Sequence, residues 1–181
     1  IESIYDAALE KNYEIVLTVS QEKAERERRH ISSLLSMKVD GLIVSVTQET
    51  TDVSIFNLVK KLNVPLVFID RIPQLNLAPS VTVDDFGGAY SAVKHFAELG
   101  HTQIAHVGGY THVNIGKARF DGFTAAMKDM QLPINESWML EGGFAEQDGY
   151  TAFKKMYESG PLPQAILAVT YPVALGIYEA A

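Results

Sequence analysis

The sequence lacks cysteine entirely over its 181 residues. Disulfides, thiolate metal sites and cysteine nucleophiles are therefore excluded. Positive charge is also scarce, because 15 Lys and Arg stand against 22 Asp and Glu and leave a formal net charge of -7. That balance argues against nucleic-acid binding through the surface of these residues. No apolar run approaches the roughly 18 residues of a membrane span, so no membrane partner is expected.

Enzyme motifs are missing as well. The sequence has no GxSxG elbow, no GxxxxGK phosphate loop and no HExxH pattern. The glycines of VGGY (107–110) lack the GxGxxG spacing of a dinucleotide site. His101, His106 and His112 fall before, within and after one predicted strand, so we do not expect them to converge on a metal. The sequence predicts a protein that is not an enzyme and that needs no cofactor or metal.

What the sequence does contain is one unit repeated along its length. Short β-branched runs alternate with helical patterns, and the runs are apolar throughout, as in parallel strands covered by helices on both faces. Right-handed crossovers are expected between such strands. The sequence predicts an α/β fold with strands at 14–19, 41–46, 65–70, 80–84, 103–108, 137–142 and 165–170. Helices are predicted at 1–12, 22–37, 52–62, 86–99, 116–130 and 146–158 and after residue 171.

One connection breaks this alternation. Residues 71–81 join two strand-like runs without a helix between them, as expected where a chain leaves one sheet and enters another. We therefore predict two lobes, an N-terminal lobe over 1–83 and a C-terminal lobe over 84–181. Ligands bind at the carboxyl ends of strands in open α/β sheets, so facing lobes would form a binding cleft.

Polar and aromatic residues collect at the predicted strand ends. Hydroxyls, carboxylates, an arginine and aromatic rings suit a neutral, polyhydroxylated ligand. Two of the candidates have simpler explanations, since Asp85 could cap a helix and Arg119 could pair with Asp121 or Asp129. The strand-end residues are Ser45, Thr47, Asp70, Arg71, Asp84, Asp85, Phe144, Thr170 and Tyr171.

The charged stretch QEKAERERRH (21–30) is expected to be a solvent-exposed helix face. Glu22–Arg26 and Glu25–Arg29 are spaced i,i+4, so the sequence predicts ion pairs on a solvated helix face rather than a basic patch.

Several motifs together resemble a known family. They are PLVFIDR (65–71), VDDFGGAYSAVKHFAELGHTQIAHVGG (83–109), RFDGF (119–123), EGGFAEQDGY (141–150) and AILAVTYPVALG (165–176). In this pattern the chain resembles the effector domain of the lactose-repressor (LacI/GalR) family of bacterial transcription regulators. The resemblance implies a type I periplasmic-binding-protein fold, with two Rossmann-like lobes joined by three crossovers. It also implies a cytoplasmic homodimer that binds operator DNA through an N-terminal helix-turn-helix domain.

The resemblance also bears on the two ends of the chain. It implies that a DNA-binding domain, a hinge helix and a first strand precede Ile1, and that further elements follow Ala181. One crossover is expected here, near residues 80–85. The alternative is a periplasmic sugar-binding protein of an ABC transporter, which shares the fold.

The family pattern assigns ligand contacts to particular residues. Arg119 matches the family's ligand arginine, and Phe144 matches its ring-stacking aromatic. Asp70 matches a polar cleft position of the N-terminal lobe, and Arg71 follows it. The resemblance thus implies a small, sugar-like effector held between guanidinium, carboxylate and ring.

The remaining assignments concern specificity. Asn114 and Ile115 lie in the loop whose residue types vary with ligand in the family. Tyr171 departs from the pattern, because most members carry an aspartate there that contacts the ligand. Pro172 holds Tyr171 extended, so the backbone is kept while the carboxylate is lost. Tyr171 either contacts the ligand or fills the space of a smaller one. Effector binding is expected to change operator affinity, as inducer or as co-repressor.

Overall fold

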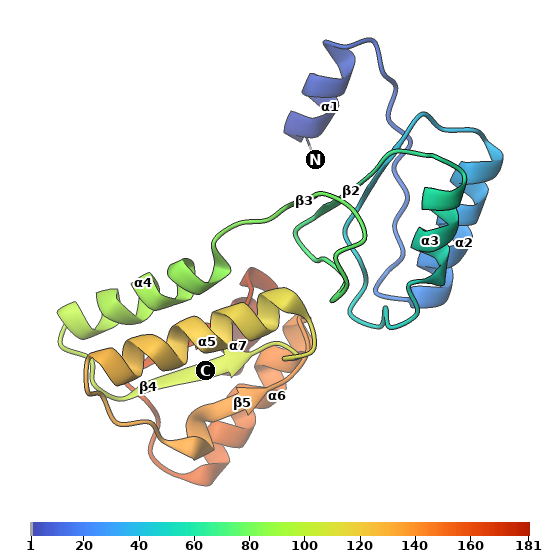
Figure 1. Ribbon diagram of the computed structural model, residues 1–181. Coiled ribbons are helices and arrows are strands. Elements are labelled where there is room, and N and C mark those ends of the chain that lie inside the picture. The colour runs from blue at the N-terminus through green and yellow to red at the C-terminus, as the bar shows by residue number, and fades with distance from the viewer. Residues whose placement is uncertain (1) are drawn as a thin grey trace.

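A computed structural model describes residues 2–181 and shows two lobes, each built on a three-stranded parallel sheet (Figure 1). The N-terminal sheet has the order β1-β2-β3, formed by Leu42–Val44, Leu66–Ile69 and Ser80–Val81. The C-terminal sheet has the order β5-β4-β6, formed by β4 Ile104–Gly108, β5 Met139–Glu141 and β6 Ala165–Ala168. The predicted α/β class with parallel sheets is confirmed.

The N-terminal lobe packs two helices against its sheet. The helices α2 (Ala24–Ser36) and α3 (Ser54–Lys61) lie side by side in Figure 1. Their apolar faces meet the sheet in one cluster, where the Phe56 ring stands edge-on to Phe68 at a centroid distance of 5.1 Å. The helix α1 (Glu2–Leu9) buries none of its residues and lies apart from this core.

The strand predicted at 14–19 is wrong. This segment is an extended loop between α1 and α2, and Val16, Leu17 and Val19 are 52%, 62% and 64% exposed. Its residue types favour a strand, but a strand also needs a neighbour that completes its main-chain hydrogen bonds. Within residues 2–181, no strand pairs with this segment.

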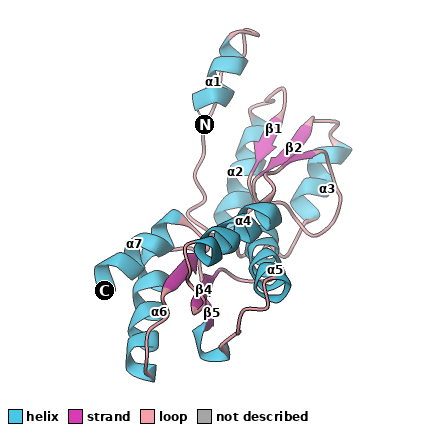
Figure 2. Cartoon of the chain, turned by 90° about the vertical axis from the view of Figure 1, so that its left-hand side faces the viewer, coloured by secondary structure: helices cyan, strands magenta, loops and turns pink. Residues whose placement is uncertain are grey.

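The C-terminal lobe has helices on both faces of its sheet (Figure 2). The helices α4 (Asp85–Glu98) and α5 (Asn114–Asp129) pack on one face, and α6 (Glu146–Ser159) and α7 (Tyr171–Ala180) on the other. The 3-10 turn η1 (Glu136–Trp138) leads into β5. Along β4, Ile104 contributes to the α4/α5 core and Ala105 and Val107 to the α6/α7 core, so the whole strand is buried.

The passage between lobes comes after β3. The helix-free connection at 70–79 joins β2 to β3, which pair parallel within one sheet, so it does not mark the change of sheet as predicted. Residues 82–84 connect β3 of the first sheet to α4 of the C-terminal lobe. The Asp84 side chain then accepts a hydrogen bond from the Gly87 amide (2.8 Å) and caps α4. Of the two neighbouring aspartates, the cap is therefore Asp84 and not Asp85.

No helix in residues 2–181 combines the length and the apolar character that crossing a membrane would require.

Candidate functional site

A cavity of about 480 Å³ lies between the two lobes. The N-terminal lobe contributes Glu22, Gln48 and Arg71, and the C-terminal lobe contributes Phe144, Ala145, Asp148, Thr170 and Pro172. A second cavity, of about 420 Å³, opens in the C-terminal lobe beside the interlobe connection. Its lining is Val83, Asp84, Asp85, Gly88, Ala89, His106, Arg119, Leu167, Ala168 and Val169. Neighbouring residues of one strand end, Val169 and Thr170, belong to the two cavities.

Two predicted site residues meet across the interlobe cavity. The Arg71 guanidinium of the N-terminal lobe lies 4.4 Å from the centre of the Phe144 ring of the C-terminal lobe. Phe144 is only 8% exposed, with Tyr110 standing edge-on to it on its own lobe. A cation over a ring face is attracted by the negative π surface. Arg71 and Phe144 therefore form a wall to which each lobe contributes one side chain.

Arg71 also has a charge partner that the sequence did not indicate. Its Nη1 donates to both carboxylate oxygens of Glu22, at 2.8 Å and 2.7 Å. The predicted Glu22–Arg26 pair is thus wrong, because Arg26 instead donates to the Gln21 side chain. The predicted Glu25–Arg29 pair is confirmed, at 3.1 Å. Glu22 precedes α2 and faces the cleft, so helical spacing does not govern its side chain.

A buried carboxylate fixes the loop that carries Gln48 to the cavity. Glu27 accepts hydrogen bonds from the Thr47 amide and the Thr50 hydroxyl, both at 2.9 Å. Burial raises the pKa of Glu27, and these two hydrogen bonds oppose the rise. The backbone N–H of Gln48 in turn donates a hydrogen bond to the Glu22 carboxylate (3.0 Å). The loop after β1 is therefore held to the start of α2, beside the cleft.

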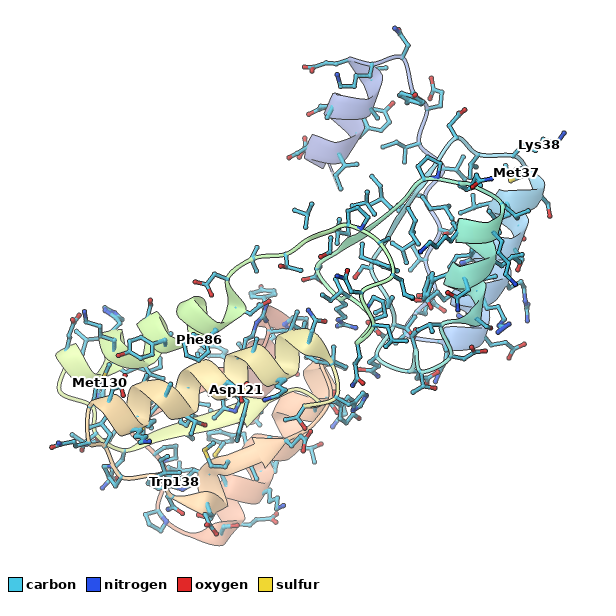
Figure 3. All side chains as sticks on the ribbon, in the orientation of Figure 1. Met37, Lys38, Phe86, Asp121, Met130 and Trp138 are labelled. Atoms are coloured by element: carbon cyan, nitrogen blue, oxygen red, sulfur yellow. The ribbon has the colours of Figure 1, made fainter. Side chains whose placement is uncertain are left out.

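Arg119 lies in the second cavity, on the first turns of α5. Its Nε donates to Asp85 Oδ1 (2.8 Å), its Nη2 lies 2.7 Å from the same oxygen, and its Nη1 donates to the Val169 carbonyl. Arg119 therefore pairs with Asp85 and not with Asp121, which is labelled in Figure 3 and accepts from Lys117 at 2.6 Å. Asp129 accepts from the Tyr90 hydroxyl (3.1 Å). Arg119 thus joins α4, α5 and the end of β6 at the cavity.

Asn114 connects the lobes directly. Its Oδ1 accepts from the Ile72 amide (3.1 Å) and its Nδ2 donates to the Asp70 carbonyl (3.0 Å). In the same loop, His112 Nε2 lies 3.1 Å from the Gln48 carbonyl. Asp70 has a φ of 58°, a left-handed conformation that aspartate adopts more readily than most residues. These contacts set the start of α5 against the ends of β1 and β2.

The strand-end candidates Asp84, Asp85 and Thr170 also line the cavities, whereas the other residues that the family pattern assigns line neither of them. These are Asp70, Asn114, Ile115 and Tyr171. Ile115 is 3% exposed and packs in the α6/α7 core. Tyr171 is 75% exposed and lines neither cavity, although its neighbours Thr170 and Pro172 line one. The Asp70 side chain is exposed, and its main chain makes the contact to Asn114. Of the residues that the family pattern assigns to the ligand, Arg71, Phe144 and Arg119 line the two cavities.

Several cavity residues are absent from the strand-end candidates, among them Glu22, Gln48, Asp148 and His106. The sequence pattern placed Glu22 in a helical ion pair and offered His106 only as a metal ligand. His106 is 1% exposed, and within the described chain its Nε2 has no hydrogen-bond partner. Desolvation lowers the pKa of His106 to about 4, so the ring is neutral at pH 7. A polar residue inside the apolar run IAHVG was the available signal for His106.

Two facing α/β lobes with a polar cavity between them define a two-lobed ligand-binding protein. The family model described as "Periplasmic binding proteins and sugar binding domain of LacI family" matches residues 1–181. The chain belongs to this family.

Relatives and solved structures agree with that assignment. The HTH-type transcriptional repressor PurR of Haemophilus influenzae (strain PittEE) is 32% identical over 99% of this chain and 53% of its own length. The chain thus spans about half the length of the curated relatives it matches. Transcription regulator CcpA of Lactococcus lactis superposes with a TM-score of 0.86 at 23% identity, covering 99% of this chain and 65% of that one. Cra of Pseudomonas putida, solved in complex with fructose 1-phosphate, superposes with a TM-score of 0.88 at 19% identity. That match covers 99% of this chain and 66% of the Cra chain. These relatives are named as regulators and not as enzymes.

Proposed function

We propose that this chain is the effector-sensing part of a LacI-type transcriptional regulator. It binds a small polar, sugar-like effector between its lobes and thereby changes the operator affinity of a DNA-binding domain elsewhere in the protein. The whole protein works in the cytoplasm as a homodimer. Family membership and the regulator names of the relatives support this proposal over a transport protein.

The observation that carries the proposal is the composition of the interlobe cavity. One lobe supplies Arg71 and the other supplies Phe144, so a ligand between them contacts both lobes at once. A ligand that touches both lobes has different affinities for different lobe orientations, and it shifts the population toward the one it binds best. Linkage then requires that DNA and effector alter each other's affinity by the same factor.

The proposal predicts that an effector stabilises the full-length protein and changes its operator affinity. A ligand at about 100 times its Kd adds about 2.7 kcal/mol to the free energy of unfolding. We expect one compound from a panel of sugars, sugar phosphates and nucleosides to raise the thermal midpoint and to shift operator affinity about 5- to 150-fold. Thermal-shift screening followed by DNA-binding titrations measures both effects.

Phe144→Leu is the matching variant, because leucine keeps an apolar side chain in the core and removes the ring face. It should lose most of the ligand-induced rise in midpoint. A compound that raises the midpoint but leaves operator affinity unchanged would contradict a regulatory role. If Phe144→Leu kept the full ligand-induced rise in thermal midpoint, the ligand would have to bind outside the interlobe cavity.

A further inference from the structure

Both arginines that face ligand space are already paired with a carboxylate. Arg71 is held by Glu22 and Arg119 by Asp85, each with N–O distances of 2.7–2.8 Å. A guanidinium beside a carboxylate still donates hydrogen bonds from its remaining N–H groups, but its net charge toward a ligand is cancelled. The cleft therefore offers hydrogen-bond donors without an excess of positive charge.

Glu22 is held in this arrangement by its hydrogen bonds, although 45% of its side chain is exposed. Its carboxylate accepts hydrogen bonds from the Arg71 guanidinium and from the backbone N–H of Gln48. Its backbone has a φ of 59°, next to Gln21 at 52°, so a tight left-handed turn aims the side chain at the cleft. The Arg71 side chain that it holds is 13% exposed. Because Arg71 is largely buried, solvent screens its charge only weakly, and the paired carboxylate of Glu22 is what neutralises it.

The other charges around the interlobe cavity also disfavour an anion. One guanidinium, that of Arg71, faces two carboxylates, those of Glu22 and Asp148. Asp148 accepts from the Ala145 amide (2.9 Å) and so covers the N-terminus of α6, where an anion could otherwise bind. The N-terminus of α7 is weakened as a donor because Pro172 has no amide N–H. A phosphate placed here would meet more negative than positive charge.

We propose that Glu22 determines the charge preference of the cleft, so that an uncharged polar ligand binds and its phosphorylated counterpart is rejected. This inference rests on the proposed function, since it concerns the ligand of the same cavity. Glu22 acts by cancelling the positive charge of Arg71, so that the carboxylate of Asp148 is the uncompensated charge that a phosphate in the cavity would meet. Like-charge contact of this kind is a means of specificity.

The test changes the charge of Glu22 and uses inorganic phosphate and fructose 1-phosphate as probes, with free fructose as the uncharged counterpart. Glu22→Gln in the full-length protein keeps the side-chain length and releases Arg71. We expect affinity for the two phosphate probes, measured by calorimetry, to rise at least about tenfold over the unaltered protein. The control is Glu25→Gln, which makes the same change of charge three residues away in the pair with Arg29 outside the cavity.

Each outcome decides the proposal. A gain in Glu22→Gln that is absent from Glu25→Gln supports it. If Glu22→Gln does not fold, Glu22→Asn takes its place, because asparagine tolerates the left-handed backbone and is also uncharged. Equal phosphate affinity in the Glu22 variant and the unaltered protein overturns the proposal, as does an unaltered protein that prefers fructose 1-phosphate to fructose at this cleft. Phosphate binding by the variant does not require the natural effector, so failure of the regulatory proposal would appear separately, as an absent effect on operator DNA.

Discussion

At the residue scale, the unusual group is a neutral histidine in the middle of a buried strand. The His106 ring packs against Phe120 and Phe123 of α5, with ring-centroid distances of 5.9 Å and 5.0 Å, and it lines the Arg119 cavity. Its folded-state pKa of about 4 is below the ordinary 6.5. The unfolded chain therefore takes up this proton first as the pH falls, and stability is lost between about pH 6.5 and pH 4.

His106→Phe should remove this pH dependence. His106 accounts for a loss of about 2 kcal/mol in the free energy of unfolding between pH 7 and pH 5, because only the unfolded state is protonated at pH 5. Urea unfolding of the full-length protein and of the variant at both pH values measures the difference. Equal losses in the two proteins would show that His106 is protonated without cost in the folded state.

At the element scale, the close crossing of α6 and α7 depends on glycine. A Cβ on Gly176 would overlap the Glu146 carbonyl oxygen in the backbone of α6. Backbone atoms cannot rotate away as a side chain can, so the two helices would have to separate. The same crossing buries Val173 beneath α6, within the α6/α7 core.

Gly176→Ala should therefore lower the free energy of unfolding by about 2 kcal/mol, measured by urea denaturation. The control is Gly88→Ala in α4, where a new Cβ would meet no atom within 4 Å. That change should raise stability by up to about 1 kcal/mol, because alanine is the better helix former. A neutral Gly176→Ala would mean that the two helices are free to move apart.

At the scale of the whole molecule, the relation between the lobes depends on few contacts. Asn114 alone provides two hydrogen bonds from the start of α5 to the N-terminal lobe. The chain crosses between the lobes once within the described residues, after β3, so side-chain contacts must supply the rest of the orientation. We expect the lobes to be held together, in the absence of effector, chiefly on the Asn114 side.

Asn114→Ala should lengthen and broaden the distribution of distances between the lobes. Spin labels on cysteines introduced at the exposed Lys61 and Lys155, one in each lobe, report that distribution. Asn135→Ala is the control, because Asn135 caps η1 by accepting from the Ser137 amide (3.0 Å) within the C-terminal lobe. Identical distributions in the two variants would show that Asn114 does not restrain the lobes.

Much of the fold was predictable because it depends on local and repeated properties. Both faces of the strand IAHVG carry mainly apolar side chains, and such a strand must be covered by other elements on both faces of its sheet. Gly100 has a φ of 88° after α4, as expected of a glycine that ends a helix. The loop at 14–19 was missed because strand formation depends on a pairing partner, which residue type does not reveal.

The α/β class, the positions of most helices and strands, and the cavity candidates Arg71, Phe144 and Arg119 follow from the amino-acid pattern and from the family that it resembles. How these side chains are paired depends on the tertiary structure. Glu22 lies 49 residues from Arg71 and Asp85 lies 34 from Arg119, so no local spacing predicts either contact. Local patterns reflect which residues avoid water, whereas ion pairs between distant segments depend on how the packed elements bring them within about 3 Å. The charge of the binding cleft is a property of that packing.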